Sequence, residues 1–203
     1  MATVVHDLKN ALGVLVQELA SLQSAAADSS LASGVSHAHG IASQLSGKLI
    51  AFLTLYRAQS GGLVAAPRDH NPDDFLNEVA AGLVLPQSAL RIRLELAQSS
   101  PPFWFFDAYL VGLALEAAVQ NATRFARSQI LLRARAEDGW LVLSVEDDGP
   151  GLGTEGAVST GLGTELCRAI AVAHVNAGKI GKVVLANCAH GAPASSFGCP
   201  DAR

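Results

Sequence analysis

The chain has 203 residues, of which 50% are hydrophobic, and a formal net charge of −4 at pH 7; this is enough apolar material for one medium domain or two small ones. The acidic balance and the lack of lysine or arginine runs exclude an extended nucleic-acid-binding surface. Apolar stretches end well before the roughly 20 residues of a membrane span, and no secretory signal is present, so we expect a soluble protein with neither a membrane span nor a nucleic-acid partner.

Two long helices are predicted at the start of the chain. Apolar residues recur in steps of three and four from Val5 to Leu22, which predicts a helix over residues 2–25. A second helix is predicted over residues 31–59, where a Ser-Gly-Gly stretch ends it. The short connection makes the pair an antiparallel hairpin. One hairpin cannot close its own core, so we expect a homodimer in which two hairpins form a four-helix bundle.

A mixed α/β region is predicted after a linker over residues 61–71. Pro72 and the two acids after it start a helix, because proline suits the first turn and acids suit the positive end of the helix dipole. Further along, alternation and helical periodicity predict strands at 90–96, 130–135, 140–145 and 182–187, and helices at 106–127 and 163–177.

This order predicts an α/β sandwich, with the helices grouped on one side of a mixed sheet. The fold class is therefore α+β: an N-terminal helical hairpin followed by the sandwich. The tail from Cys188 to Arg203 shows no alternation where a closing strand would be expected. For the tail we predict an irregular end.

A candidate phosphoacceptor opens the first helix, in the sequence His6-Asp7-Leu8-Lys9-Asn10. Neutral imidazole is a competent nucleophile near pH 7. Asp7 can orient the ring of His6 or take its proton, and Asn10, one turn along, can hold a water or a phosphoryl oxygen. The alternative is that His6 is an ordinary solvated histidine at a helix start.

A candidate nucleotide site lies more than a hundred residues downstream. Asp147 at a strand end can accept a hydrogen bond from an exocyclic amine such as that of adenine. Gly149 and Gly151 allow close approach of the backbone to a ligand. After them, Gly161-Leu162-Gly163 opens a helix whose free amides can bind phosphate oxygens. An isolated D-x-G-x-G is, however, more often a plain turn.

The preceding long helix carries two further candidates. Asn121 can ligate Mg²⁺ through its side-chain oxygen, and Arg124, three residues later, shares its face and can reach phosphate. The order of Asn-bearing helix, strand hairpin, D-x-G-x-G, glycine loop and helix resembles the ATP-binding module of the GHKL superfamily over about residues 72–187.

The resemblance implies roles for these residues in binding ATP and Mg²⁺. Asn121 would hold magnesium and Asp147 would read adenine, while Gly149, Gly151, Gly161 and Gly163 would be hinges of an ATP lid. Together with the His-Asp-x-Lys-Asn pattern, the whole chain resembles the sensor histidine kinases. Residues 1–62 would then be the dimerisation and histidine phosphotransfer hairpin, and residues 70–203 the ATP-binding catalytic domain.

The leading hypothesis is a cytoplasmic, homodimeric histidine kinase. It would phosphorylate His6 from Mg-ATP and pass the phosphoryl group to an aspartate of a response-regulator receiver. The sequence begins five residues before His6, so we expect no attached sensor. Three cysteines without metal-like spacing fit reduced thiols in the cytoplasm; they are Cys167, Cys188 and Cys199.

One departure from the family pattern opens a second hypothesis. Kinases of this family usually carry Asn or Glu four residues before the magnesium-binding Asn, where this chain has Ala117. Glu116 is one residue away, about 100° around the helix. The alternative is a histidine phosphotransferase that shuttles phosphoryl groups between receivers without ATP. A third, non-enzymatic possibility is a dimeric adaptor whose hairpin binds a partner helix.

Overall fold

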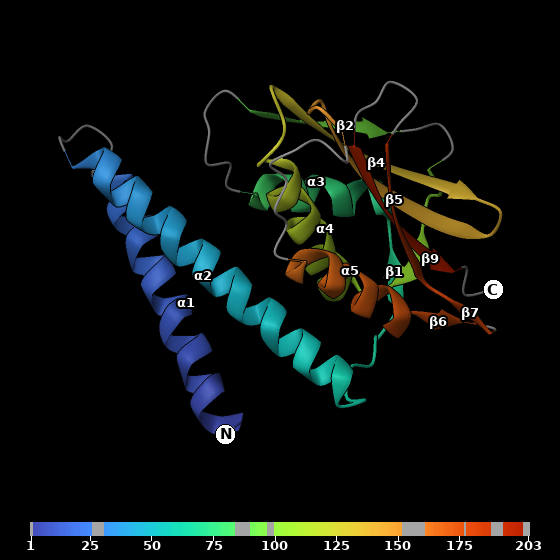
Figure 1. Cartoon of the computed structure of the whole chain (residues 1–203), viewed down its shortest axis with the longest axis horizontal. Coiled ribbons are helices and arrows are strands. Elements are labelled where there is room, and N and C mark those ends of the chain that lie inside the picture. The colour runs from blue at the N-terminus through green and yellow to red at the C-terminus, as the bar shows by residue number, and fades with distance from the viewer. Residues whose placement is uncertain are drawn as a thin grey trace. The chain divides into compact units, whose positions relative to one another are not determined.

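The computed structural model describes residues 2–25, 31–83, 90–96, 100–151, 161–176, 178–187 and 193–200. The chain divides into two compact units, Met1–Thr54 and Leu55–Arg203. Figure 1 labels the helices and strands of both units. Within the described ranges, no helix is both long enough and apolar enough to cross a membrane.

The first unit is a pair of long helices, α1 (Ala2–Ala25) and α2 (Ala32–Gln59), the second of which continues past the unit boundary. Both agree with the predicted helices to within one residue, and Gln23 Nε2 donates a hydrogen bond from α1 to Ser36 Oγ of α2 at 3.2 Å. The predicted turn at residues 26–30 lies outside the described residues.

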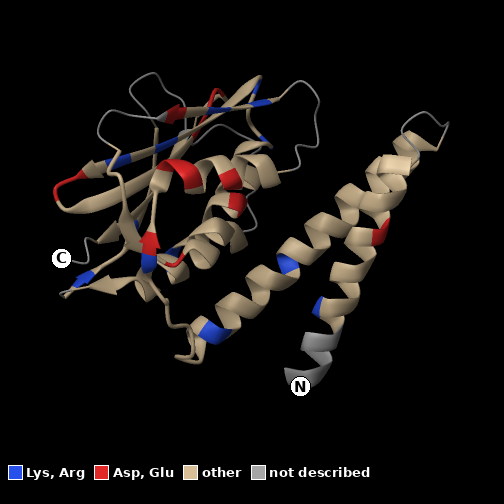
Figure 2. Ribbon diagram, turned by 180° about the vertical axis from the view of Figure 1, so that it is seen from behind, with Lys and Arg blue, Asp and Glu red and all other residues tan. Residues whose placement is uncertain are grey.

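The surface of the hairpin is poor in charge and rich in exposed apolar side chains. From residue 8 onward, the described parts of α1 and α2 carry four charged residues, and Figure 2 shows most of both helices without charge; they are Lys9, Glu18, Lys48 and Arg57. Large apolar side chains are exposed on both helices, namely Leu8, Val14, Leu15, Leu22, Ile41, Leu45, Phe52 and Tyr56. Such a surface is typical of helices that pack against a further pair.

The second unit contains a five-stranded mixed sheet in the order β2-β4-β5-β9-β8. Its strands are β2 (Arg91–Leu96), β4 (Gln129–Glu137), β5 (Trp140–Asp147), β8 (Lys182–Asn187) and β9 (Pro193–Pro200). The pair β2 and β4 is parallel and the other pairs are antiparallel. Asp138 and Gly139 join β4 to β5 with φ of 51° and 77°, as a tight two-residue hairpin turn requires.

Three helices lie on one face of this sheet (Figure 1). They are α3 (Pro72–Gly82), α4 (Ala108–Ala122) and α5 (Leu162–Ala173). The core lies between these helices and alternate residues of the central strands, and its fully buried members include Val111, Leu115, Ile130, Leu132, Leu141, Leu143 and Ile170. The predicted sandwich, with helices grouped on one side of a mixed sheet, is confirmed.

Side-chain caps explain where two of the helices begin. The Asn71 carboxamide oxygen accepts hydrogen bonds from the amides of Asp73 and Asp74 at 2.8 and 3.0 Å, at the start of α3. Asp107 Oδ1 accepts from the Leu110 amide at 3.0 Å, at the start of α4. Each cap satisfies amides that the first helical turn leaves without an intrahelical partner.

The predicted irregular tail is wrong, because residues 193–200 form β9 between β5 and β8. Phe197 and Cys199 of this strand are buried at 4% and 0% exposure. The residues around them are Ala, Ser, Gly and Pro, so the strand carries little of the alternation by which strands are found in a sequence. Pairing on both sides stabilises it instead. The rest of the predicted tail, residues 188–192 and 201–203, lies outside the described residues.

Several short elements were not predicted. The expected linker contains β1 (Arg68–His70), which pairs antiparallel with β3 (Trp104–Phe106). The helix expected over residues 106–127 is shorter, because Phe106 belongs to β3 and α4 ends at Ala122. The helix expected to reach residue 177 ends at Ala173 and is followed by the paired two-residue strands β6 (Val175–Asn176) and β7 (Lys179–Ile180).

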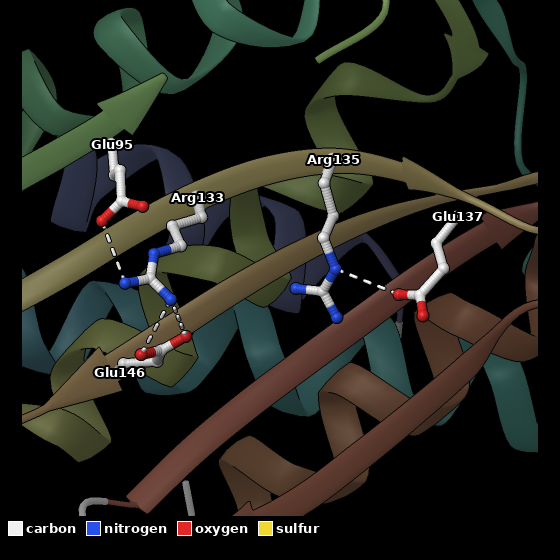
Figure 3. Close-up of polar contacts among 5 residues, drawn as sticks. All are labelled: Glu95, Arg133, Arg135, Glu137 and Glu146. Carbon is white, nitrogen blue, oxygen red and sulfur yellow. Dashed lines mark hydrogen bonds and ion pairs between the residues drawn. The ribbon is translucent and has the colours of Figure 1, made fainter. Parts of the chain in front are cut away.

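The sheet face away from the helices carries an ion-pair network (Figure 3). Arg133 of β4 pairs with Glu95 of β2 at 2.9 Å and with Glu146 of β5 at 3.1 Å. Arg135 pairs with Glu137 at 3.0 Å. The Arg133 side chain is one-third exposed, so its pairs contribute modestly to stability, while they join three neighbouring strands.

Candidate functional site

The residues predicted to bind nucleotide come from three segments that meet at the end of α4. The Cys167 thiol donates a hydrogen bond to the Ala114 carbonyl at 3.3 Å, so α5 runs beside α4. A Cβ on Gly163 would lie 3.7 Å from the Ala117 carbonyl oxygen. Gly149, just after β5, lies against the Phe125 carbonyl. The start of α5, the end of α4 and the end of β5 are therefore adjacent.

Asp147 is the last residue of β5 and its side chain faces the core. It is 8% exposed, and its Oδ1 accepts a hydrogen bond from the Gly149 amide at 2.9 Å. Burial raises the pKa of its carboxyl, an effect that the Gly149 hydrogen bond opposes and the neighbouring Asp148 charge reinforces. A buried carboxylate held in this way can accept a further hydrogen bond from a planar amine.

Gly149 leaves no room for a side chain. A Cβ there would lie 2.5 Å from Asp147 Oδ1 and 2.6 Å from the Phe125 carbonyl oxygen. Gly151 has a φ of 93°, a conformation that side-chain-bearing residues rarely adopt. The two glycines therefore serve different needs, close packing at Gly149 and backbone conformation at Gly151.

Asn121 lies in the last turn of α4 and is half-buried. Arg124 is exposed in the turn beyond the helix, with its guanidinium 5.7 Å from the Phe125 ring centroid. The helix that was expected to carry both residues ends at Ala122, so Arg124 lies in the turn after α4, where its amide donates to the Asn121 carbonyl at 3.2 Å. Among the described residues no three His, Cys, Asp or Glu side chains gather as a metal site.

The start of α5 has the backbone predicted for a phosphate-binding turn. Gly161 is the N-cap, with a φ of 73° and no side-chain cap hydrogen bond. This differs from α3 and α4, whose first amides are capped by Asn71 and Asp107. Leu162 and Gly163, the first residues of α5, are half-buried. The loop that the sequence analysis assigned to an ATP lid, residues 152–160, lies outside the described residues.

The backbone of the predicted phosphoacceptor lies in α1, as expected. His6 and Asp7 are helical, and their side chains lie outside the described part of the chain. Asn10 is exposed one turn later.

The position where the sequence departs from the family pattern faces the start of α5. Ala117 lies one turn before Asn121 and is half-buried, and a Cβ added to Gly163 would lie 3.8 Å from the Ala117 Cβ, in ordinary van der Waals contact. Glu116 is exposed, yet neighbouring groups remove enough water from its carboxylate to raise its pKa. The two neighbours on α4 thus differ in setting, since Ala117 is directed towards the start of α5 and Glu116 is exposed.

Asp148 is the polar residue that the sequence analysis missed. Its carboxylate accepts hydrogen bonds from the amides of Arg127, Ser128 and Gln129 at 2.7, 3.0 and 3.3 Å, and from Ser128 Oγ at 2.6 Å. Desolvation is the largest single effect and raises the pKa of Asp148, but the four hydrogen bonds together outweigh it and lower the pKa to about 2. The sequence shows two adjacent acids, Asp147 and Asp148, at the end of a predicted strand. It does not show which of them faces the core and which binds the turn after α4.

His174, after α5, is a buried packing residue. It is 2% exposed, and its Nε2 accepts a hydrogen bond from the Asp107 amide at 3.1 Å. The proton is therefore on Nδ1, which lies 2.8 Å from the Ile170 carbonyl and donates to it. Burial lowers the pKa of this imidazole.

No protein-family model matches the sequence, and no curated protein sequence matches it significantly. Solved structures do match. Histidine kinase AdeS of Acinetobacter baumannii is 20% identical with a TM-score of 0.65, and 98% of each chain is covered. Full-length ShkA in complex with AMPPNP is 21% identical with a TM-score of 0.68; the match covers 98% of this chain and 45% of ShkA.

A third match is to a catalytic domain alone. The nucleotide-free catalytic domain of histidine kinase ThkA is 20% identical with a TM-score of 0.56, over 67% of this chain and 96% of that domain. The predicted resemblance is confirmed at the level of the fold. The chain has the fold of the histidine kinases, a helical hairpin followed by a GHKL-type α/β sandwich.

Proposed function

We propose that the chain is a histidine kinase, which binds Mg-ATP at the end of α4 and phosphorylates His6. The observation that carries the proposal is the convergence of Asp147, Gly149, Gly163 and the last turns of α4 within a histidine-kinase fold. If the D-x-G-x-G sequence were only a turn, there would be no reason for the helix bearing Asn121 to lie beside it, or for the glycine-capped start of α5 to lie beside that helix. Residues 70–203 would be the ATP-binding domain and residues 1–62 the phosphotransfer hairpin.

The residues present fit a nucleotide. The Asp147 carboxylate is buried and accepts a hydrogen bond from the Gly149 amide. A carboxylate can accept several hydrogen bonds, so it can also accept one from the adenine amine. Gly161, the N-cap of α5, has no side chain with which to cap the first turn, and the amides of a helix start suit phosphate oxygens. Arg124 is an exposed cation near the end of α4 and would approach the phosphates.

The residues also fit Mg²⁺ held mainly by the nucleotide. Magnesium in phosphoryl-transfer sites is commonly bound by one or two protein oxygens together with substrate phosphates. Asn121, in the last turn of α4, would supply an amide oxygen. When bound, the ion supplies charge neutralisation on the phosphates.

In the reaction, the His6 imidazole attacks the terminal phosphoryl group. A nitrogen–phosphorus bond forms as the bond to the ADP oxygen breaks, and Asp7 orients the ring or accepts its proton. Asn10 and Lys9, on the next turn of α1, would hold phosphoryl oxygens. A receiver aspartate of a response regulator would then take the phosphoryl group from His6.

A homodimer through the hairpin is part of this proposal. Both α1 and α2 expose large apolar side chains and carry few charged residues. This surface supports a four-helix bundle. We further propose that the protein acts in the cytoplasm, where the buried free thiols of Cys167 and Cys199 stay reduced.

Incubation with γ-labelled ATP and Mg²⁺ tests the kinase. We expect acid-labile label that is lost in His6→Ala and kept in His37→Ala, which removes an exposed histidine of α2. Asp147→Asn should abolish both labelling and submillimolar nucleotide binding. Label that survives His6→Ala, or its absence from the wild type, would contradict the proposed autophosphorylation.

A histidine phosphotransferase is the second candidate, and Ala117 favours it. A methyl group stands where related kinases usually carry an amide or carboxylate, and this position faces Gly163 at the start of α5. This candidate predicts that the wild type does not bind Mg-ATP but accepts phosphoryl from a phosphorylated receiver at His6. An adaptor without phosphotransfer predicts that receiver binding is the same in His6→Ala and that no phosphoryl moves.

A further inference from the structure

The Asp148 carboxylate holds three consecutive backbone amides and one hydroxyl, all from the segment that leads from α4 into β4. One oxygen, Oδ1, accepts from the amides of Arg127, Ser128 and Gln129, and the other accepts from Ser128 Oγ at 2.6 Å. Bonds from several donors to one ionised acceptor are stronger than neutral hydrogen bonds. The group stays charged throughout the physiological range, since its pKa is about 2.

Residues 123–126 connect this clamp to the predicted magnesium ligand. The amides of Arg124 and Phe125 donate to the carbonyls of Asn121 and Ala122 at 3.2 and 3.0 Å, and the Ala126 amide donates to the Ala122 carbonyl at 2.8 Å. The turn is therefore tied to α4 at one end and to Asp148 at the other. In its middle, the Phe125 carbonyl lies against Gly149, two residues after Asp147.

We propose that Asp148 is a positioning residue of the nucleotide site, which holds the end of α4, and with it Asn121, in place against Asp147 and Gly149. This inference rests on the proposed nucleotide-binding function of that site. Asp147 and Asp148 then have distinct roles: the first faces the core and meets the base, and the second faces the opposite way and holds the segment on which the magnesium ligand depends.

The bonds of Asp148 are not needed to hold the sheet together. Strands β4 and β5 pair over eight positions, from Ile130 with Asp147 to Glu137 with Trp140, and the clamp lies beyond the last of these. The Ser128 carbonyl is held separately, by the Arg91 amide at 3.0 Å. Loss of the Asp148 carboxylate should therefore loosen residues 123–129 and leave the strands paired.

Two variants and a control test the proposal. Asp148→Ala removes all acceptors, whereas Asp148→Asn keeps one oxygen for the amides and can donate to Ser128 Oγ. Asp69→Ala is the matched control, because Asp69 is an exposed aspartate of β1 in the same unit. For each protein, Mg-ATP affinity is measured by titration and amide hydrogen exchange is measured by NMR without nucleotide.

We expect Asp148→Ala to weaken Mg-ATP binding by about tenfold or more and to accelerate exchange of the amides of residues 123–129 to a similar degree. Exchange of residues 130–137 of β4 and of β5 should stay as in the wild type. Asp148→Asn should restore affinity to within about threefold of the wild type, and Asp69→Ala should match the wild type in both measurements.

Unchanged exchange at residues 123–129 in Asp148→Ala would overturn the inference, whatever the nucleotide result. Acceleration spread evenly over the sheet, without rescue by Asp148→Asn, would show a general structural role and also overturn it. Faster exchange confined to residues 123–129, in an Asp148→Ala variant that binds Mg-ATP as tightly as the wild type, would overturn it as well. A wild type that binds no nucleotide would instead refute the proposed function, and with it the role of Asp148 in that site. Exchange at residues 123–129 would then still show whether Asp148 holds the turn.

Discussion

The carbonyl oxygen of Phe125 lies where a side chain on Gly149 would begin. A Cβ at that position would be 2.6 Å from this oxygen and 2.5 Å from Asp147 Oδ1, closer than non-bonded atoms approach. The end of α4 and the turn after β5 are thus in contact through backbone atoms, and Gly149 is required for space.

Gly149→Ala should therefore damage both stability and the candidate site. We expect a loss of about 1–3 kcal/mol in the free energy of unfolding, the usual cost of overpacking, and a large loss of Mg-ATP affinity. Gly112→Ala is the matched control, since a Cβ on Gly112 in α4 would meet nothing within 4 Å. It should stabilise the helix by about 0.5–1 kcal/mol. Urea unfolding measures both, and equal effects would contradict the packing argument.

His174 should make stability depend on pH below about 6.5, its ordinary pKa. Burial lowers the pKa of His174 in the folded protein, so the unfolded chain binds the proton first as the pH falls. The contribution is complete above pH 6.5 and is lost as the pH falls towards the folded-state pKa, with a slope of up to about 1.4 kcal/mol per pH unit. Urea unfolding between pH 8 and 5 measures it.

His174→Leu should be less stable than the wild type at pH 8 by about 1–3 kcal/mol, because the Asp107 amide loses its acceptor. Its stability should change less between pH 8 and 5. The exposed His37 provides the control, and His37→Ala should keep the wild-type pH dependence. A His174→Leu variant as pH-sensitive as the wild type would assign that sensitivity to other groups.

Leu45→Lys should break the proposed homodimer. Leu45 is 54% exposed on α2 and belongs to the apolar face that the sequence predicts to pack in the bundle. Loss of two buried leucines, one from each copy, should weaken dimerisation on the order of 100-fold. Gln44→Lys adds the same charge at the adjacent exposed position and should stay dimeric in light scattering. A monomeric wild type, or a dimeric Leu45→Lys, would contradict this interface.

Ser144→Ala should be neutral or stabilising by up to about 1 kcal/mol. Ser144 is 1% exposed, and its hydroxyl has no hydrogen-bond partner among the described residues, so removing it relieves an unpaired polar group. Ser128→Ala makes the same chemical change where the hydroxyl donates to Asp148 at 2.6 Å and should cost about 1 kcal/mol. Urea unfolding measures both variants. A larger loss of unfolding free energy in Ser144→Ala than in Ser128→Ala would contradict the prediction.

Regular patterns allowed much of the fold to be predicted. Apolar spacing marked α1 and α2, strict alternation marked β2, and the Asp138-Gly139 turn marked the hairpin of β4 and β5. The strands β1, β3, β6 and β7 have two or three residues each, too few for any period to appear. The end of α4 was placed too late because residues 123–127 suit a helix, while tertiary contacts of the turn with Gly149 and Asp148 end it at Ala122.

The sequence by itself determined the helical hairpin and the order of the longer strands and helices before residue 188, and it named Asn121, Asp147 and the glycines as candidate site residues, since each depends on local spacing and side-chain chemistry. Only the tertiary structure decided that residues 193–200 form a central strand, that Gly149 must admit the Phe125 carbonyl, and that Asp148 rather than its neighbour clamps the turn after α4. Each of these depends on which segments meet in space. The small side chains of residues 193–200 and the two identical acids at 147 and 148 do not reveal those contacts in the sequence.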